Sequence, residues 1–162
     1  MRRLASIAPA ALLLALPAGI AEAGWERAQW NMTPEQVAEA MGGQAPLRRG
    51  GRLGDKVVRN VGQHSIGRAR FRTEYYYDAQ GLALVTLDRR SGDCREIAQS
   101  IVDQHGQPLR TSDQVILRLF IWHDRPQSNR IRLMVSHGLC NLHYERLSDY
   151  EAHDLAEARR GA

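Results

Sequence analysis

The sequence predicts an α+β domain in which an antiparallel sheet of about six strands carries two helices on one of its faces. Two observations lead to this fold class. Several segments alternate apolar and polar residues, which is typical of strands with one buried face. Two segments have helical spacing, and each precedes three of the strand-like segments. The expected order is therefore α-βββ-α-βββ, with room for a short helix at the C-terminus.

Residues 1–23 have the features of a signal peptide. A positively charged start is followed by an apolar stretch over residues 4–20, and Ala21-Glu22-Ala23 forms an A-x-A cleavage site. We expect cleavage before Gly24 and a mature protein in the periplasm or secreted; a retained anchor is the alternative. The apolar stretch is short and interrupted by prolines, which disfavours a membrane span. No transmembrane segment is expected in the mature chain.

The length of the chain limits the number of domains, and its charge limits the kinds of partner. Residues 24–147 are expected to form a single domain, and residues 148–162 a polar tail or short helix. The formal net charge is +4, and arginine supplies nearly all of the basic side chains. Because arginine binds carboxylate and phosphate in a bidentate manner, an anionic ligand is one candidate partner. Nucleic acid is a poor candidate for an exported protein, despite the basic charge.

The first helix begins at a strong capping signal. Thr33 is the expected N-cap, Pro34 occupies the first helical position, and Gln36 completes a capping box. Gly42 ends the helix. The basic, glycine-rich residues 47–55 follow and are expected to form a surface loop, since they lack the full spacing of a phosphate-binding loop.

Three strands are expected next, over residues 56–61, 68–77 and 82–88. The middle strand alternates strictly and predicts a buried face and a polar face. The buried face would carry Ala69, Phe71, Thr73, Tyr75 and Tyr77. The turn over residues 78–81 joins this strand to the third.

The second helix is expected to begin near Ser91 or Asp93 and to end at Gly106. Three strands follow over residues 115–123, 130–137 and 140–147, and a loosely docked helix is expected over residues 149–160. Both halves of the chain therefore begin with a capped helix that leads into strands. An internal repeat would explain this pattern, and it predicts that both helices dock on the same side of the sheet.

Cys94 and Cys140 are the two cysteines of the chain. Both fall on predicted inward faces, Cys94 on the second helix and Cys140 on the last strand. A cysteine pair in an exported protein is typical of a disulfide. A redox role is not expected, because the sequence has no C-x-x-C motif.

A second candidate site lies on the predicted polar face of the sheet. Arginine, aromatic residues and methionine are enriched at protein interfaces, and they alternate along these strands. Either a partner or the terminal segments of the chain itself would cover the aromatic side chains. The residues that we predict to bind a partner are Arg70, Arg72, Arg118, Phe120, Trp122, Arg132 and Met134.

Catalytic and metal-binding patterns are weak. His123, His137 and His143 lie near the ends of neighbouring predicted strands, and three histidines can hold zinc or copper. Their spacing matches no metal motif, and His137 and His143 should point to opposite faces. No G-x-S-x-G motif is present. We therefore expect no cofactor, no metal and no catalytic residue.

Three short stretches of the sequence resemble motifs of a known family. The residues Met32-Thr33-Pro34-Glu35-Gln36-Val37, Gly43-Gln44-Ala45-Pro46 and Gly81-Leu82-Ala83-Leu84-Val85 are similar to motifs of the small outer-membrane assembly lipoproteins of the SmpA/BamE type. The layout also resembles the modules of the β-lactamase-inhibitor-protein type. The lipid-bearing cysteine of the lipoproteins is missing here. The resemblance implies a protein-binding scaffold of the cell envelope that has no catalytic activity.

The sequence thus favours an exported, non-catalytic binding or adaptor protein, with an envelope protein or an anionic ligand as its partner. The alternative hypothesis is a small periplasmic hydrolase or metal-binding protein that uses the surface histidines.

Overall fold

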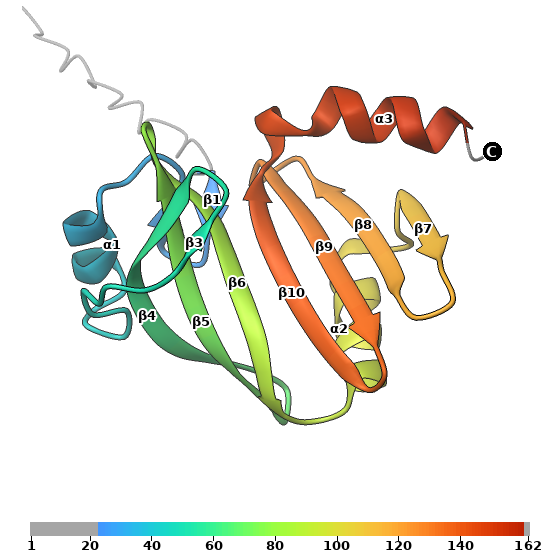
Figure 1. Cartoon of the computed structure of the whole chain (residues 1–162), viewed down its shortest axis with the longest axis horizontal. Helices are drawn as coiled ribbons and strands as arrows, with labels where there is room; N and C mark the ends of the chain where they lie inside the picture. Colours follow the sequence, from blue (N-terminus) through green and yellow to red (C-terminus); the bar gives the residue numbers. More distant parts are fainter. Residues whose placement is uncertain (1–22, 161–162) are drawn as a thin grey trace, which may run out of the picture.

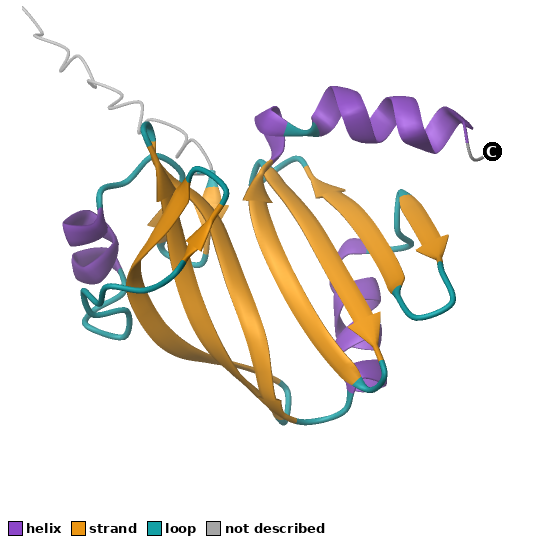
Figure 2. Cartoon of the chain, in the orientation of Figure 1, coloured by secondary structure: helices purple, strands orange, loops and turns teal. Residues whose placement is uncertain are grey.

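The computed structural model describes residues 23–160, so the predicted signal peptide lies outside the described residues except for Ala23. The helices and strands are coloured along the chain in Figure 1 and by type in Figure 2. Their bounds are β1 (Gly24–Trp25), β2 (Ala28–Gln29), α1 (Pro34–Ala40), β3 (Arg52–Leu53), β4 (Lys56–Ile66), β5 (Ala69–Asp78), β6 (Gly81–Ser91), α2 (Cys94–His105), β7 (Arg110–Asp113), β8 (Arg118–Asp124), β9 (Asn129–Ser136), β10 (Leu139–Arg146), the 3₁₀-helix η1 (Leu147–Asp149) and α3 (Glu151–Arg160).

Eight strands form one antiparallel sheet in the order β3-β4-β5-β6-β10-β9-β8-β7. Each half of this sheet is a meander of four consecutive strands, and the last strands of the two meanders, β6 and β10, pair at the centre (Figure 1). The sheet curls. Helix α2 lies behind β9 and β8, and α3 crosses the ends of the second meander (Figure 2). Strands β1 and β2 form a separate small hairpin.

The hydrophobic core lies on one side of the sheet, which we call the core side. A row of directly paired residues crosses five strands there: Tyr75, Val85, Tyr144, Ile131 and Trp122. All five are buried in a single cluster. The same cluster contains Val37 of α1, Ile97 and Ile101 of α2, and Trp25 and Trp30 from the N-terminal hairpin.

The alternation of β5 is confirmed. Every second residue of this strand is buried, beginning at Ala69 and including Phe71, Tyr75 and Tyr77. Strand pleating alone produces this result, because neighbouring side chains point to opposite faces. The sequence pattern therefore sets the orientation of the strand that carries the largest share of the aromatic core.

The predicted six-stranded sheet in the order α-βββ-α-βββ is wrong. The main sheet has eight strands, and a two-stranded sheet precedes α1. The third helix, α3, lies where a short C-terminal helix was expected. The strands that the sequence did not reveal, β3 and β7, are short edge strands of two and four residues, and neither has a buried residue. Without a buried face, a strand leaves no apolar alternation to recognise. Strand β4 also extends to Ile66, beyond the predicted end at residue 61.

Helix α1 begins as predicted and is fastened to the sheet by a buried amide. Its capping box is formed: the Thr33 backbone N–H donates to Gln36 Oε1 over 2.8 Å. Asn60 of β4 is fully buried and donates from Nδ2 to the carbonyl oxygens of Pro34 and Ala45, over 3.0 and 2.8 Å. The Tyr77 hydroxyl donates to Asn60 Oδ1 over 2.5 Å. These bonds satisfy polar atoms that would otherwise be costly to bury.

The disulfide between Cys94 and Cys140 is confirmed. It joins the first residue of α2 to β10, with a Cα–Cα distance of 5.8 Å. Cys140 is buried on the core side, in the same cluster as Leu142. The bond therefore ties α2 to the last strand of the second meander, which lies at the centre of the whole sheet.

None of the helices within residues 23–160 is both long enough and apolar enough to span a membrane.

Replacing both cysteines by serine should lower the free energy of unfolding by about 3–4 kcal/mol, because the bond closes a loop with a sequence separation of 46 residues. Urea denaturation followed by tryptophan fluorescence measures this change. The wild-type protein under reducing conditions is the control and should show the same loss. A difference below about 0.5 kcal/mol, the level of an ordinary surface substitution, would contradict the structural role.

Candidate partner-binding surface

The side of the sheet opposite the core, which we call the outward side, is predominantly polar at its centre. One row of directly paired residues there consists of Glu74, Thr86, His143 and Arg132. Arg132 Nη2 lies 2.9 Å from both His143 Nδ1 and Glu145 Oε1. On the neighbouring meander, Glu74 accepts hydrogen bonds from Arg72 and Tyr76. These charged side chains are largely paired within the sheet.

A buried ionic network fastens helix α3 to one end of the outward side. Asp154 of α3 is fully buried and receives two hydrogen bonds from Arg130 of β9, over 2.5 and 2.9 Å. His123 Nε2 of β8 lies 3.0 Å from the same carboxylate. Arg130 also pairs with Glu145, and its guanidinium lies 4.6 Å from the ring centroid of Tyr150. The predicted loosely docked helix is therefore held by charge-assisted hydrogen bonds.

Two groups on the outward side, Asp154 and His143, have shifted pKa values. Burial alone would raise the pKa of Asp154, but the hydrogen bonds from Arg130 and His123 outweigh burial and lower this pKa below its usual range. For His143, burial lowers the pKa to about 3, and the positive charges of Arg132 and Arg130 act in the same direction. His143 is therefore neutral, and its Nδ1 atom accepts a hydrogen bond from Arg132.

The structure separates the residues that we predicted to bind a partner. Cross-strand pairing places Phe120 opposite Leu133 and Trp122 opposite Ile131, which are core residues. Trp122 is buried, and its indole N–H donates to the Gly106 carbonyl over 2.9 Å. The core side therefore carries Arg118, Phe120 and Trp122, whereas the outward side carries Arg70, Arg72, Arg132 and Met134.

The reason for this error is the apolar run from Val115 to Trp122. Both faces of such a run are apolar, so alternation does not tell which face is buried. We predicted Phe120 and Trp122 to point outward, but they pack side by side toward the core with ring centroids 6.0 Å apart.

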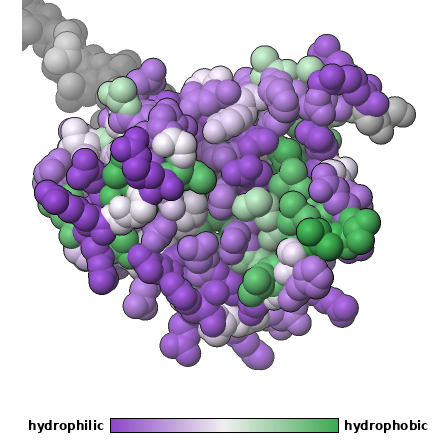
Figure 3. Space-filling model, viewed as in Figure 1, coloured by the Kyte–Doolittle hydropathy of each residue, from purple (hydrophilic) through white to green (hydrophobic). Residues whose placement is uncertain are grey.

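An exposed apolar patch lies on the outward side of the second meander, and Met134 is its one residue that we predicted to bind a partner. We define the apolar patch as Val115, Ile116, Leu119, Met134 and Leu139. Leu119 pairs directly with Met134. Val115, Ile116 and Leu139 are exposed by 103%, 64% and 66%. Figure 3 shows this hydrophobic surface at the right of the view, over strands β7 to β9.

Val115 and Ile116 occupy the tip of the β7–β8 hairpin. Gln114 and Leu117 exchange backbone hydrogen bonds of 2.9 and 3.2 Å, which leaves these two residues as the loop. Two-residue hairpin loops favour asparagine, aspartate and glycine, and β-branched residues are poorly suited to them. Neither the turn nor the core explains why the tip is apolar.

The structure does not gather the predicted histidine cluster into a metal site. His123 contacts Asp154, His143 contacts Arg132, and His137 contacts Ser136 in an exposed turn. Within residues 23–160, no group of three or more histidine, cysteine, aspartate or glutamate side chains is arranged to hold a metal ion.

Comparisons with protein-family models, with curated proteins and with solved structures give no match to this chain. The resemblance to the SmpA/BamE type and to β-lactamase-inhibitor-protein modules therefore stays a prediction.

The low pKa of His143 predicts a pH-dependent stability. Between pH 6.5 and about 3, the unfolded chain binds a proton at this position that the folded protein excludes. Stability should therefore fall as the pH drops below 6.5, by up to about 1.4 kcal/mol per pH unit. Urea denaturation between pH 7.5 and 4.5 measures the slope.

In the same urea experiments, the free energy of unfolding of H143N should fall less steeply with decreasing pH than that of the wild-type protein. The matched control H137N changes a histidine in an exposed turn, away from the ionic network, and should keep the wild-type slope. Equal slopes for H143N and the wild-type protein would refute the assignment.

Proposed function

We propose that this chain is an exported, non-catalytic binding protein that docks on an envelope protein through the apolar patch. The observation that carries the proposal is the hairpin tip, where Val115 and Ile116 are exposed without contributing to the core. Contiguous exposed apolar surface on a folded domain is typical of a protein interaction site.

The location of the proposed partner rests on two features of the chain. Residues 1–23 have the sequence pattern of a signal peptide, and the two cysteines are joined in a disulfide. Structural disulfides form and persist in oxidising compartments such as the periplasm and the extracellular space. Both features favour an exported protein.

The composition around the patch supports a protein partner. Leu119 and Met134 form the centre of the patch on paired strands, and Leu139 extends it along β10. Methionine is unbranched and adapts its shape to a partner surface. Arg132 lies two residues before Met134 on β9, on the same side of the sheet. It places a charged side chain at the rim of the patch. An apolar centre with a polar rim is the usual anatomy of an interface.

Catalysis is left out of the proposal because the candidate histidines do not act together. His123 and His143 are each bound to a different charged side chain of the sheet or of α3. Their contacts fasten structural elements to one another, which explains their burial without a substrate.

A photo-crosslinking residue at position 116, introduced in the cells that export the protein, tests the proposal. We expect a defined adduct with one envelope protein, because the side chain at this position projects from the hairpin tip. The same residue at position 39, which is exposed on α1, is the control and should give no such adduct. An adduct twice the mass of the chain would instead reveal self-association and contradict the proposal.

The crosslinked partner, once purified, should bind the wild-type chain at least tenfold more tightly than the I116D variant, because the substitution places a charge in the contact. L53D is the matched control, since Leu53 is also an exposed apolar residue, at 49%, but lies on β3. Both variants should melt within a few degrees of the wild-type protein. Equal loss of binding by I116D and L53D would overturn the role of the patch.

A further inference from the structure

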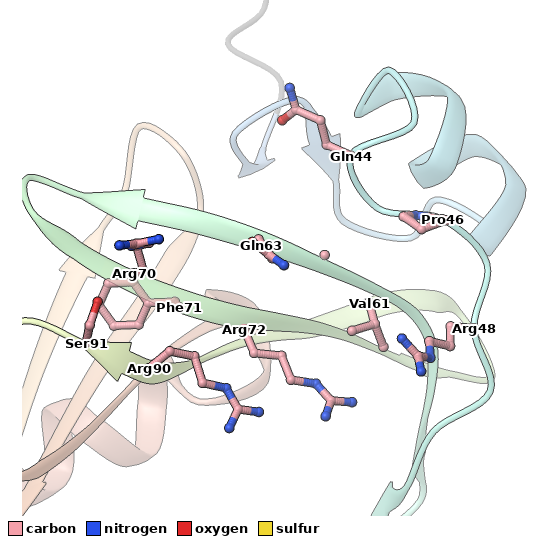
Figure 4. Close-up of a pocket in the computed structure, with 11 residues that line it drawn as sticks. Gln44, Pro46, Arg48, Val61, Gln63, Arg70, Phe71, Arg72, Arg90 and Ser91 are labelled. Carbon is pink, nitrogen blue, oxygen red and sulfur yellow. The ribbon is translucent and has the colours of Figure 1, made fainter.

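The first meander carries a cleft of about 830 Å³ that is lined by arginine and has no carboxylate in its lining. Its walls come from the segment before β4 and from strands β4, β5 and β6 (Figure 4). The polar residues of the lining are Gln44, Arg48, Gln63, Arg70, Arg72, Arg90 and Ser91. This composition is distinct from that of the apolar patch, which lies on the other meander.

The positive charge of the cleft is largely uncompensated. Arg48, Arg70 and Arg90 take part in no ion pair with the residues that the structure describes. Arg72 pairs with Glu74, with Nη2 and Oε1 2.6 Å apart, but its buried Nε atom has no hydrogen-bond partner within residues 23–160.

The positions of the arginines follow from the sheet itself. Arg70 pairs with Ser91 across β5 and β6, and a register shift next to this pair places Arg90 near the same end of the strands. Figure 4 shows Arg72 and Arg90 extending in the same direction, with Arg48 approaching from the opposite wall. A β-bulge re-aims side chains at the edge of a sheet in this manner.

Two carboxylates lie close to the cleft, but they do not cancel its charge. Glu74 is bound by Arg72 and by the Tyr76 hydroxyl. Asp88 pairs across the strands with Arg72, and burial, with the Glu74 charge, raises the pKa of Asp88. Four arginines in the lining therefore face two nearby carboxylates, which leaves an excess of positive charge.

We propose that this cleft binds an anion that carries at least two phosphate groups. Guanidinium groups match phosphate oxygens in bidentate geometry, and four of them spread over the cleft suit several charges better than one. The volume lies within the range of small-molecule sites. Gln44, Gln63 and Ser91 add neutral hydrogen-bonding groups for the part that links the phosphates.

Isothermal titration calorimetry of the purified mature chain with inorganic pyrophosphate tests the proposal. We expect saturable binding that R72Q/R90Q weakens at least tenfold. The control R159Q/R160Q removes the same charge from α3 and should bind as the wild-type protein does. Because R72Q leaves Glu74 without its cation, R48Q/R90Q provides a second variant that breaks no ion pair among the described residues. Comparable binding by the cleft variants and the α3 variant would overturn the proposal.

Co-sedimentation with vesicles distinguishes a lipid headgroup from a soluble phosphate compound. Cardiolipin carries two phosphates, and its vesicles should retain the wild-type chain if the source is a membrane, whereas phosphatidylcholine vesicles should not. Binding of pyrophosphate without retention on cardiolipin would support a soluble ligand in the same cleft. Absence of binding to both probes would refute the anion site. The apolar patch lies on the other meander, so its partner assay would be unaffected by this outcome.

Discussion

The pairing of β6 with β10 is the constraint on which the rest of the structure depends. It joins two four-stranded meanders into one sheet, and it sets Val85 opposite Tyr144 and Leu87 opposite Leu142. A shift of one residue in this register would turn the buried residues of one meander toward the other face. The disulfide from Cys94 to Cys140 adds a covalent restraint at β10, next to this junction. The same side of the sheet therefore faces the hydrophobic core in both meanders.

The outward side is divided into regions with different chemistry. Helix α3 covers one end, where Arg130 and Asp154 form a buried, doubly hydrogen-bonded ion pair. A buried pair of this kind contributes little net stability compared with apolar packing, but removal of one partner leaves a costly unpaired charge. Such a network fixes the position of the helix more than it strengthens the fold. The helix in turn leaves the arginine cleft and the apolar patch exposed on the two separate meanders.

The sequence allowed good prediction wherever a local rule acted alone. The capping box at Thr33 and the alternation of β5 follow from capping and pleating, and both are confirmed. The Cys94–Cys140 bond, predicted from two cysteines on inward faces, is also confirmed, although it joins residues 46 positions apart. The strand count and the orientation of β8 depend on tertiary context. Strands β3 and β7 have no buried face, and the apolar run before Trp122 fits either orientation. The ion pair of Asp154 with Arg130 joins residues 24 positions apart, and no local pattern signals it.

The central claim is that one side of the sheet faces the hydrophobic core and that Met134 lies on the opposite side. Hydroxyl-radical footprinting of the purified protein, read by mass spectrometry, tests this claim residue by residue. Met134 and Trp122 are both intrinsically reactive and lie on neighbouring strands, with Met134 on the outward side and Trp122 2% exposed on the core side. The account predicts strong oxidation of Met134, together with Ile116, and protection of Trp122 until the protein unfolds. Oxidation of Trp122 in the native state at a rate similar to that of Met134 would contradict the assignment of the two sides.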